Sequence, residues 1–364
     1  MKTLTATSLF DGADVIVCCG SGGVGKTTAA AVIGLEAAAR GRRVVVVTID
    51  PARRLADALG LPGGLSGEPR PVEQDGPGEL WAMMLDTAAT FDALVRRYAT
   101  DAAQAERIVA NAFYRNMAHS LSGTQEYMAA ETLHELHGDE RFDLVVVDTP
   151  PSRNALDFLE APGVLARFLD HRLFKLLMLP ARRSMKVVNV ATQPVLRAVG
   201  RVVGSDVLAD AVAFFQAFAG MEGGFRERAG AVMALVRSPA TRYVVVASPH
   251  RETVAEAVWF TGQLREQGLD HVGGIVNRVH PRFGDGDAAG ADGAAEAARA
   301  DGRDDLAALW ANVAELRRLG EAEREEVAPF AAVLGGPVIG EVPLLPTDVH
   351  DLTTLTELRT HLFP

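Results

Sequence analysis

The 364-residue sequence contains few cysteines and few aromatic residues, and it has no C-x-x-C pair. Its two cysteines, Cys18 and Cys19, are adjacent in an apolar run, where neighbouring side chains of a strand point to opposite faces. We therefore expect no disulfide between them and no zinc site. Two buried thiols without a disulfide framework are typical of a reducing, cytoplasmic environment.

The sequence also lacks an excess of positive charge and long hydrophobic runs. Its formal net charge is −11, whereas nucleic-acid binding needs a basic surface. No run of 18 apolar residues is present, and the N-terminus has no basic-then-apolar signal pattern. We expect a cytoplasmic protein that does not bind nucleic acid.

The most informative segment follows the first apolar run and leads into an alanine-rich helical pattern. It has the strand, glycine-rich loop and helix order of a P-loop, in which backbone N–H groups surround phosphate oxygens. Lys26 is expected to reach the β- and γ-phosphates, and the Thr27 hydroxyl to bind Mg²⁺. The predicted nucleotide-binding residues of this loop are Gly20, Ser21, Gly22, Gly23, Val24, Gly25, Lys26, Thr27 and Thr28.

Apolar strand-like runs alternate with helical patterns over most of the chain. This alternation predicts an α/β fold with a parallel, doubly wound sheet of the P-loop NTPase type, in a single domain over 1–364. Two blocks without strand patterns, about 87–137 and 154–236, predict an inserted helical subdomain. The expected strands are 15–19, 43–48, 80–85, 142–147, 243–247, 272–276 and 337–342.

Two aspartates end β-branched strand runs, and ligands gather at the carboxyl ends of parallel strands. Asp148 has the Walker B position and is expected to hold Mg²⁺ together with Thr27, through water. Asp50 precedes Pro51, so it can cap a helix that begins there.

These motifs resemble those of the arsenical-pump and tail-anchored-protein-targeting ATPases (the ArsA-like family), in a branch often called anion-transporting ATPase. The resemblance implies that Asp50 orients the attacking water, a role compatible with a helix cap. It implies that Asn277 contacts adenine, although a turn-forming Asn is the alternative. It also implies that Pro343 and Leu344 pack over the adenine ring. The resemblance rests on the P-loop, Asp50-Pro-Ala, Asp148-Thr-Pro-Pro, the helical insertion, Val276-Asn-Arg and Val342-Pro-Leu-Leu-Pro.

One departure from the family pattern concerns the partner. The second P-loop position of this class carries a lysine that reaches the partner's nucleotide across a dimer interface, and here it is Ser21. The resemblance therefore implies a dimer and favours a heterodimer with a paralogue that carries the lysine. A homodimer in which Arg53 or Arg153 replaces the lysine is the alternative.

The function that these motifs imply is a Mg-dependent ATPase switch that couples its nucleotide state to a protein client or partner cycle. One alternative is the energising subunit of an oxyanion pump, although no cysteine cluster is present to bind arsenite. Another is a nucleotide-sensing scaffold with little turnover, which Ser21 favours and Asp50 opposes.

Two further segments have unusual composition. Residues 167–201 are basic with interleaved apolar residues, which indicates a membrane surface, an acidic helical partner or an ordinary solvated face. The client expected for this chain is a hydrophobic or membrane-bound one. Residues 285–305 are all Gly, Ala or charged, so we expect a flexible acidic loop there.

Overall fold

The computed structural model describes residues 4–50, 54–115, 124–150, 210–211, 213–214, 217–218, 220–281, 283–345 and 349–364. The basic segment 167–201, Arg53 and Arg153 lie outside these ranges, so the hypotheses that concern them stay predictions.

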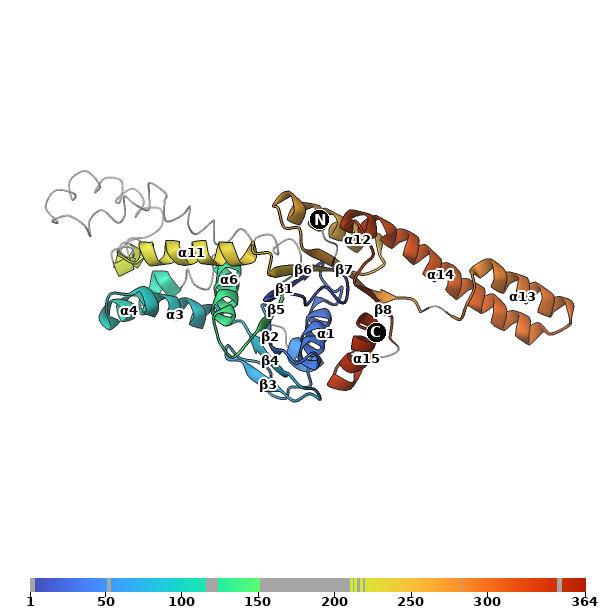
Figure 1. Ribbon diagram of the computed structural model, residues 1–364, viewed down its shortest axis with the longest axis horizontal. Helices are drawn as coiled ribbons and strands as arrows, with labels where there is room; N and C mark the ends of the chain where they lie inside the picture. Colours follow the sequence, from blue (N-terminus) through green and yellow to red (C-terminus); the bar gives the residue numbers. More distant parts are fainter. Residues whose placement is uncertain are drawn as a thin grey trace.

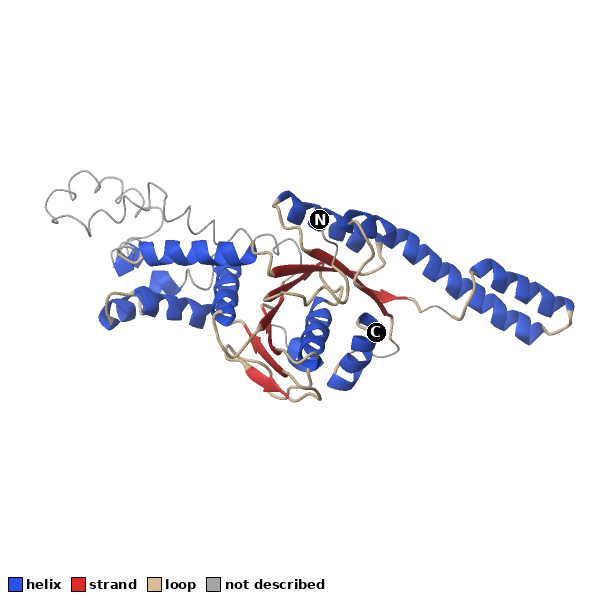
Figure 2. Ribbon diagram, in the orientation of Figure 1, coloured by secondary structure: helices blue, strands red, loops and turns tan. Residues whose placement is uncertain are grey.

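In the described part of the chain, eight strands form one sheet in the order β3-β4-β2-β5-β1-β6-β7-β8 (Figure 2). All neighbouring pairs are parallel except β3 with β4. The predicted α/β fold is confirmed. The strands are β1 Val15–Gly20, β2 Arg43–Thr48, β3 Arg70–Val72, β4 Glu79–Met84, β5 Leu144–Asp148, β6 Thr241–Ala247, β7 Val272–Val279 and β8 Gly340–Pro343. The strands expected at 142–147 and 337–342 are shifted toward the C-terminus, and β3 was not predicted.

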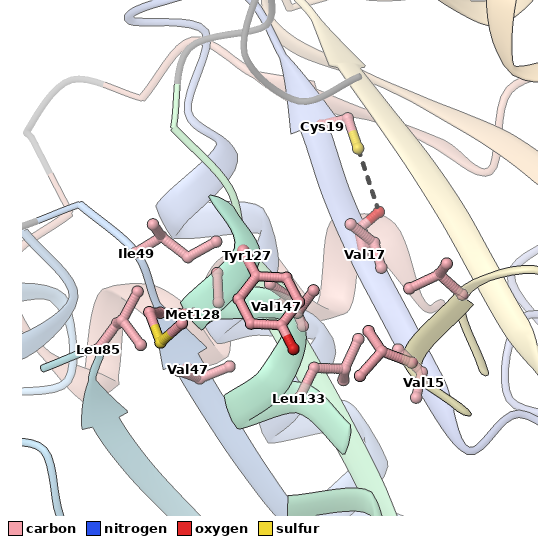
Figure 3. Packing of buried hydrophobic residues seen from close by; sticks show 14 of the residues in the cluster. Val15, Val17, Cys19, Val47, Ile49, Leu85, Tyr127, Met128, Leu133 and Val147 are labelled. Carbon is pink, nitrogen blue, oxygen red and sulfur yellow. Dashed lines mark hydrogen bonds between the residues drawn. The ribbon is translucent and has the colours of Figure 1, made fainter. Parts of the chain in front are cut away.

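The central strands are buried on both faces, as their continuous β-branched runs predict. Val44 and Val46 of β2 face α1 (Lys26–Ala39), and Val45 and Val47 face the opposite side. There α6 (Thr124–His137) covers the sheet with Tyr127, Met128 and Leu133 (Figure 3).

The two cysteines follow the same alternation. Cys18 belongs to the core cluster on the α1 side, and Cys19 to the cluster on the α6 side. Both thiols are buried and neither forms a disulfide.

Further helices gather with α6 on the side of the sheet opposite α1 (Figure 1). The first predicted helical block contains α3 (Thr87–Tyr98), α4 (Ala102–Val109) and α6, and the described part of the second contains α11 (Glu222–Val236). A partly buried ion pair joins two of these helices, because Arg228 of α11 donates to the carboxylate of Glu131 of α6. The remaining described helices are α2 (Arg54–Ala58), α12 (Arg251–Glu266), α13 (Ala288–Ala300), α14 (Asp304–Leu334) and α15 (Leu352–Leu362).

The expectation of a flexible acidic loop at 285–305 is wrong. Most of this segment is α13, which packs along α14 in a hairpin that extends away from the sheet (Figure 1). Asp287 caps the helix by accepting a 2.8 Å hydrogen bond from the backbone N–H of Gly290. A segment without large apolar side chains was expected to form no packed structure. A row of alanines on one helix face can nevertheless pack closely against a second helix, because their side chains are small. That buried row consists of Ala288, Ala291, Ala295 and Ala298.

Among the described helices, none is both long and apolar enough to cross a bilayer.

Candidate functional site

Two glycines determine the shape of the loop between β1 and α1, and any other residue at either position would displace neighbouring atoms. Gly20 has a φ of 147°, and a Cβ there would lie 2.2 Å from the carbonyl oxygen of Val246 in β6. Gly25 has a φ of 95°, and a Cβ there would lie 2.1 Å from Nδ2 of Asn277 in β7. Both positions combine a left-handed backbone with a close approach, which only glycine permits.

Lys26 places its ammonium group inside this loop. Its Nζ donates a 2.7 Å hydrogen bond to the carbonyl oxygen of Ser21, and the side chain is buried. Burial lowers the pKa of Lys26, while the carboxylate of Asp148 acts in the opposite direction. The loop therefore encloses a cation where phosphate oxygens would lie.

The carboxylate of Asp148 lies directly behind the loop, at the end of β5. Its Oδ2 accepts hydrogen bonds of 2.7 Å from Thr27 Oγ1 and 2.9 Å from Thr48 Oγ1. Burial raises the pKa of Asp148 to about 6, although both hydroxyl donors act to lower it.

The chemistry of this pair fits a magnesium ion. Oδ1 of Asp148 is buried and has no hydrogen-bond partner within the described residues. A carboxylate oxygen beside a threonine hydroxyl is a hard oxygen donor set of the kind that Mg²⁺ prefers. Thr27 and Asp148 are thus the residues that would hold the ion.

Thr48 was missed as a site residue, although the sequence carried a signal for it. Parallel pairing places Thr48 of β2 directly beside Asp148 of β5. Both end similar β-branched runs, so an in-register alignment of the two strands would have placed the hydroxyl next to the carboxylate.

Asp50 lies beyond the end of β2 and faces the same space as Lys26. Its backbone N–H donates a 3.2 Å hydrogen bond to Thr48 Oγ1, and its Oδ2 is 3.7 Å from Nη1 of Arg54. Residues 51–53 lie outside the description, so the helix-cap interpretation stays a prediction. The residue before Asp50 is bonded to α6, because Nε2 of Gln125 donates a 3.1 Å hydrogen bond to the carbonyl oxygen of Ile49.

Asn277 lies in β7, at an irregularity in its pairing with β8, rather than in a turn. Its Nδ2 donates a 2.8 Å hydrogen bond to the carbonyl oxygen of Val24. The next residue, Arg278, has a φ of 65° and donates to the Gly23 carbonyl at 3.3 Å. The end of β7 therefore supports the P-loop backbone from the side.

A cavity of about 650 Å³ joins most of these elements, a size typical of small-molecule sites. Predicted residues that line it are Gly22, Gly23, Gly25, Lys26, Thr27, Thr28, Asp50, Asn277, Pro343 and Leu344. Gly20, Ser21, Val24 and Asp148 are not among its lining residues. Lining residues that the sequence did not single out include Arg54, Asp57, Thr149, Arg278 and His350.

Comparison with known proteins gives a consistent result. A family model described as "Anion-transporting ATPase" matches residues 13–287. The chain is 30% identical over 155 residues to ATPase GET3 of Malassezia globosa, covering 42% of this chain and 44% of that protein. It is 32% identical over 154 residues to the ATPase ASNA1 homolog of Babesia bovis, covering 42% of this chain and 39% of that protein. It is 30% identical over 161 residues to protein Rv2184c of Mycobacterium tuberculosis, covering 42% of this chain and 38% of that protein. The chain thus spans less than half the length of each of these relatives.

Proposed function

This chain belongs to the anion-transporting ATPase family, and from that premise we propose that it binds and hydrolyses Mg·ATP at the cavity beside the P-loop. The observation that carries the proposal is the convergence of Lys26, Thr27 and Asp50 on this one cavity. Phosphoryl transfer depends mainly on positioning and charge stabilisation, and these three side chains supply both.

Each residue has a distinct role in this proposal. The loop and Lys26 bind the phosphates, and Thr27 and Asp148 hold the ion. When bound, Mg²⁺ supplies positive charge that offsets the negative charge of the phosphate oxygens. Asp50 orients the water that attacks the γ-phosphate, because its carboxylate lies just beyond the end of β2 and lines the same cavity as Lys26.

The adenine is proposed to lie at the other end of the cavity, against Pro343 and Leu344. Leu344 is 44% exposed, so it offers an apolar surface that a ring could cover. Asn277 is suited to the adenine edge because its amide offers both a donor and an acceptor.

We propose that nucleotide state is coupled to the helices on the α6 side of the sheet. The hydrogen bond between Gln125 and the Ile49 carbonyl supports this, because it joins the segment that carries Asp50 to α6. In this proposal the helical subdomain binds a hydrophobic or membrane-bound client in the cytoplasm.

The pump alternative receives no support from the thiols. Both cysteines are at most 1% exposed, and burial raises the pKa of Cys19 to about 12. A thiol held protonated inside the core is a poor ligand for arsenite, since the thiolate is the binding form.

The partner is proposed to be a second ATPase chain. Ser21 has no positive charge to lend to another subunit, so we propose a heterodimer with a paralogue that has lysine at this position.

Asp50→Asn tests the hydrolysis proposal and separates it from the scaffold alternative. The amide keeps the shape of the carboxylate, so the variant should bind Mg·ATP normally and lose single-turnover hydrolysis. Asp75→Asn, an exposed aspartate away from the cavity, is the matched control. Equal turnover by Asp50→Asn and wild type would exclude a catalytic role for Asp50. No turnover by wild type in the presence of its partner would favour the nucleotide-sensing scaffold.

A further inference from the structure

We propose that Glu256 of α12 is a positioning residue for the P-loop, acting through Ser21. The Ser21 hydroxyl donates a hydrogen bond to Oε2 of Glu256. The same serine offers its backbone carbonyl to Nζ of Lys26 at 2.7 Å. Glu256 therefore fixes the residue that in turn fixes the phosphate-binding lysine. The proposal rests on the ATP site proposed above and adds a residue that lies outside its cavity.

The local fold explains why Ser21 meets α12. Gly20 approaches the carbonyl of Val246 so closely that even a Cβ would not fit. This contact places the next residue, Ser21, beside the end of β6. Helix α12 begins at Arg251, shortly after β6 ends at Ala247. The second turn of α12, which carries Glu256, thus passes the second position of the P-loop.

Helix α12 is itself firmly placed, so it can serve as a fixed support. Its start is tied to the preceding turn, because Thr253 Oγ1 donates to the carbonyls of Ser248 at 2.7 Å and His250 at 2.9 Å. Val254 and Ala257 of the helix are buried in the core on either side of Glu256. A carboxylate on such a helix has little freedom to move away from Ser21.

The consequence for Lys26 follows from burial. Ser21 and Lys26 are 6% and 7% exposed, so solvent cannot easily replace a lost acceptor for the ammonium group. Without the bond to Glu256, the Ser21 peptide group is free to rotate, and the carbonyl leaves the position in which it holds Lys26. Misplacement of Lys26 should weaken phosphate binding more than it slows the step on bound ATP.

A set of variants tests this inference by calorimetric titration with Mg·ATP and by steady-state kinetics. Ser21→Ala and Glu256→Ala should each weaken Mg·ATP binding about tenfold, which corresponds to the loss of one buried hydrogen bond. The double variant should be no weaker than either single one, because both remove the same interaction. KM should rise while kcat at saturating ATP stays within about twofold.

The controls distinguish positioning from general stability. Glu256→Gln keeps an acceptor oxygen and should restore binding to within about threefold of wild type. Glu252→Ala removes an exposed carboxylate from the same helix and should bind as wild type does. Unchanged affinity in Glu256→Ala, additive effects in the double variant, or equal losses in Glu256→Gln and Glu256→Ala would overturn the inference. Failure of the wild-type chain to bind Mg·ATP would instead overturn the proposed function.

Discussion

Thr27 Oγ1 donates a 2.7 Å hydrogen bond to Asp148 Oδ2, which joins the first turn of α1 to the end of β5. Asp148 is 1% exposed, and its other oxygen has no partner within the described residues. The carboxylate is thus fixed in position, and its burial makes the charged form unfavourable. The pKa of about 6 expresses that cost.

Asp148→Asn should make the metal-free protein more stable at pH 8. The folded-state pKa of about 6 is above the unfolded value near 4, so the folded protein binds this proton more tightly and loses stability as pH rises through 6. An amide removes the buried charge and should raise the Tm by a few degrees at pH 8, with no gain below about pH 4. Calorimetric scans in chelator measure this, with exposed Asp75→Asn as the control.

Adding Mg·ATP should reverse this order of stability, so that wild type becomes more stable than Asp148→Asn. Wild type gains stability from the bound ion and nucleotide, and Asp148→Asn should gain much less because it lacks one metal-holding carboxylate. A variant that is less stable than wild type at pH 8 in chelator would contradict the assignment of Asp148 as a destabilising buried charge.

Lys26→Ala should abolish measurable Mg·ATP binding. The loop then loses the cation that is enclosed against the Ser21 carbonyl, where it is expected to meet the β- and γ-phosphates. Titration calorimetry measures the loss. Arg318→Ala removes an exposed cation from the α13–α14 hairpin, where it pairs with Asp292, and should bind normally. Unchanged affinity in Lys26→Ala would remove the P-loop assignment.

Ala295→Glu should loosen the α13–α14 hairpin without changing nucleotide binding. Ala295 is 4% exposed on the face toward α14, so a charged side chain there must be desolvated or must push the helices apart, at a local cost of about 2–3 kcal/mol. Ala297→Glu places the same side chain on the exposed face of α13 and is the matched control. Hydrogen exchange should show lost protection in α13 for Ala295→Glu alone. Equal protection in both variants would mean that the hairpin is not packed in solution.

The parts of the fold that the sequence predicted correctly are those governed by local pattern. The β-branched runs of β2 and β5 identified the central strands, and the spacing of the P-loop glycines placed Lys26 at the start of α1. The α13 helix was missed because composition was weighed above spacing. Ala288, Ala291, Ala295 and Ala298 recur at intervals of three and four residues, which is a helical signal even in a segment without large apolar side chains.

Contacts between distant segments could not be read from local pattern. Glu256 lies 235 positions from Ser21, on a helix whose exposed and buried faces alone do not reveal which loop it passes. The hydrogen bond from Asn277 to the Val24 carbonyl likewise depends on the position of β7 beside β6 and on the course of the loop between β1 and α1. Both contacts depend on the order of the strands in the sheet, which no local pattern in the sequence specifies.

Ser21→Lys tests the partner proposal, and the structure predicts that this single change fails to activate the chain alone. The Ser21 hydroxyl already touches the carboxylate of Glu256, so a lysine at position 21 would pair with that carboxylate within its own chain. Its ammonium group is then unavailable to another subunit. Ser21→Lys/Glu256→Ala removes the competing carboxylate and should increase hydrolysis at saturating Mg·ATP. Ser21→Lys/Glu252→Ala keeps Glu256 and should remain slow.

Steady-state assays compare these variants with wild type alone and wild type mixed with a paralogue that has lysine at the second P-loop position. The paralogue should stimulate the wild-type chain strongly, since a cation supplied in trans accelerates phosphoryl transfer by roughly 10³–10⁵-fold. Lys26→Ala mixed with the same paralogue is the control that assigns the hydrolysis to this chain's own site. Vigorous hydrolysis by pure wild type, with no gain from the paralogue or from Ser21→Lys/Glu256→Ala, would rule out the heterodimer. Faster hydrolysis by the single variant Ser21→Lys would show instead that Glu256 does not hold the introduced lysine, because the lysine side chain would then be reaching the second subunit.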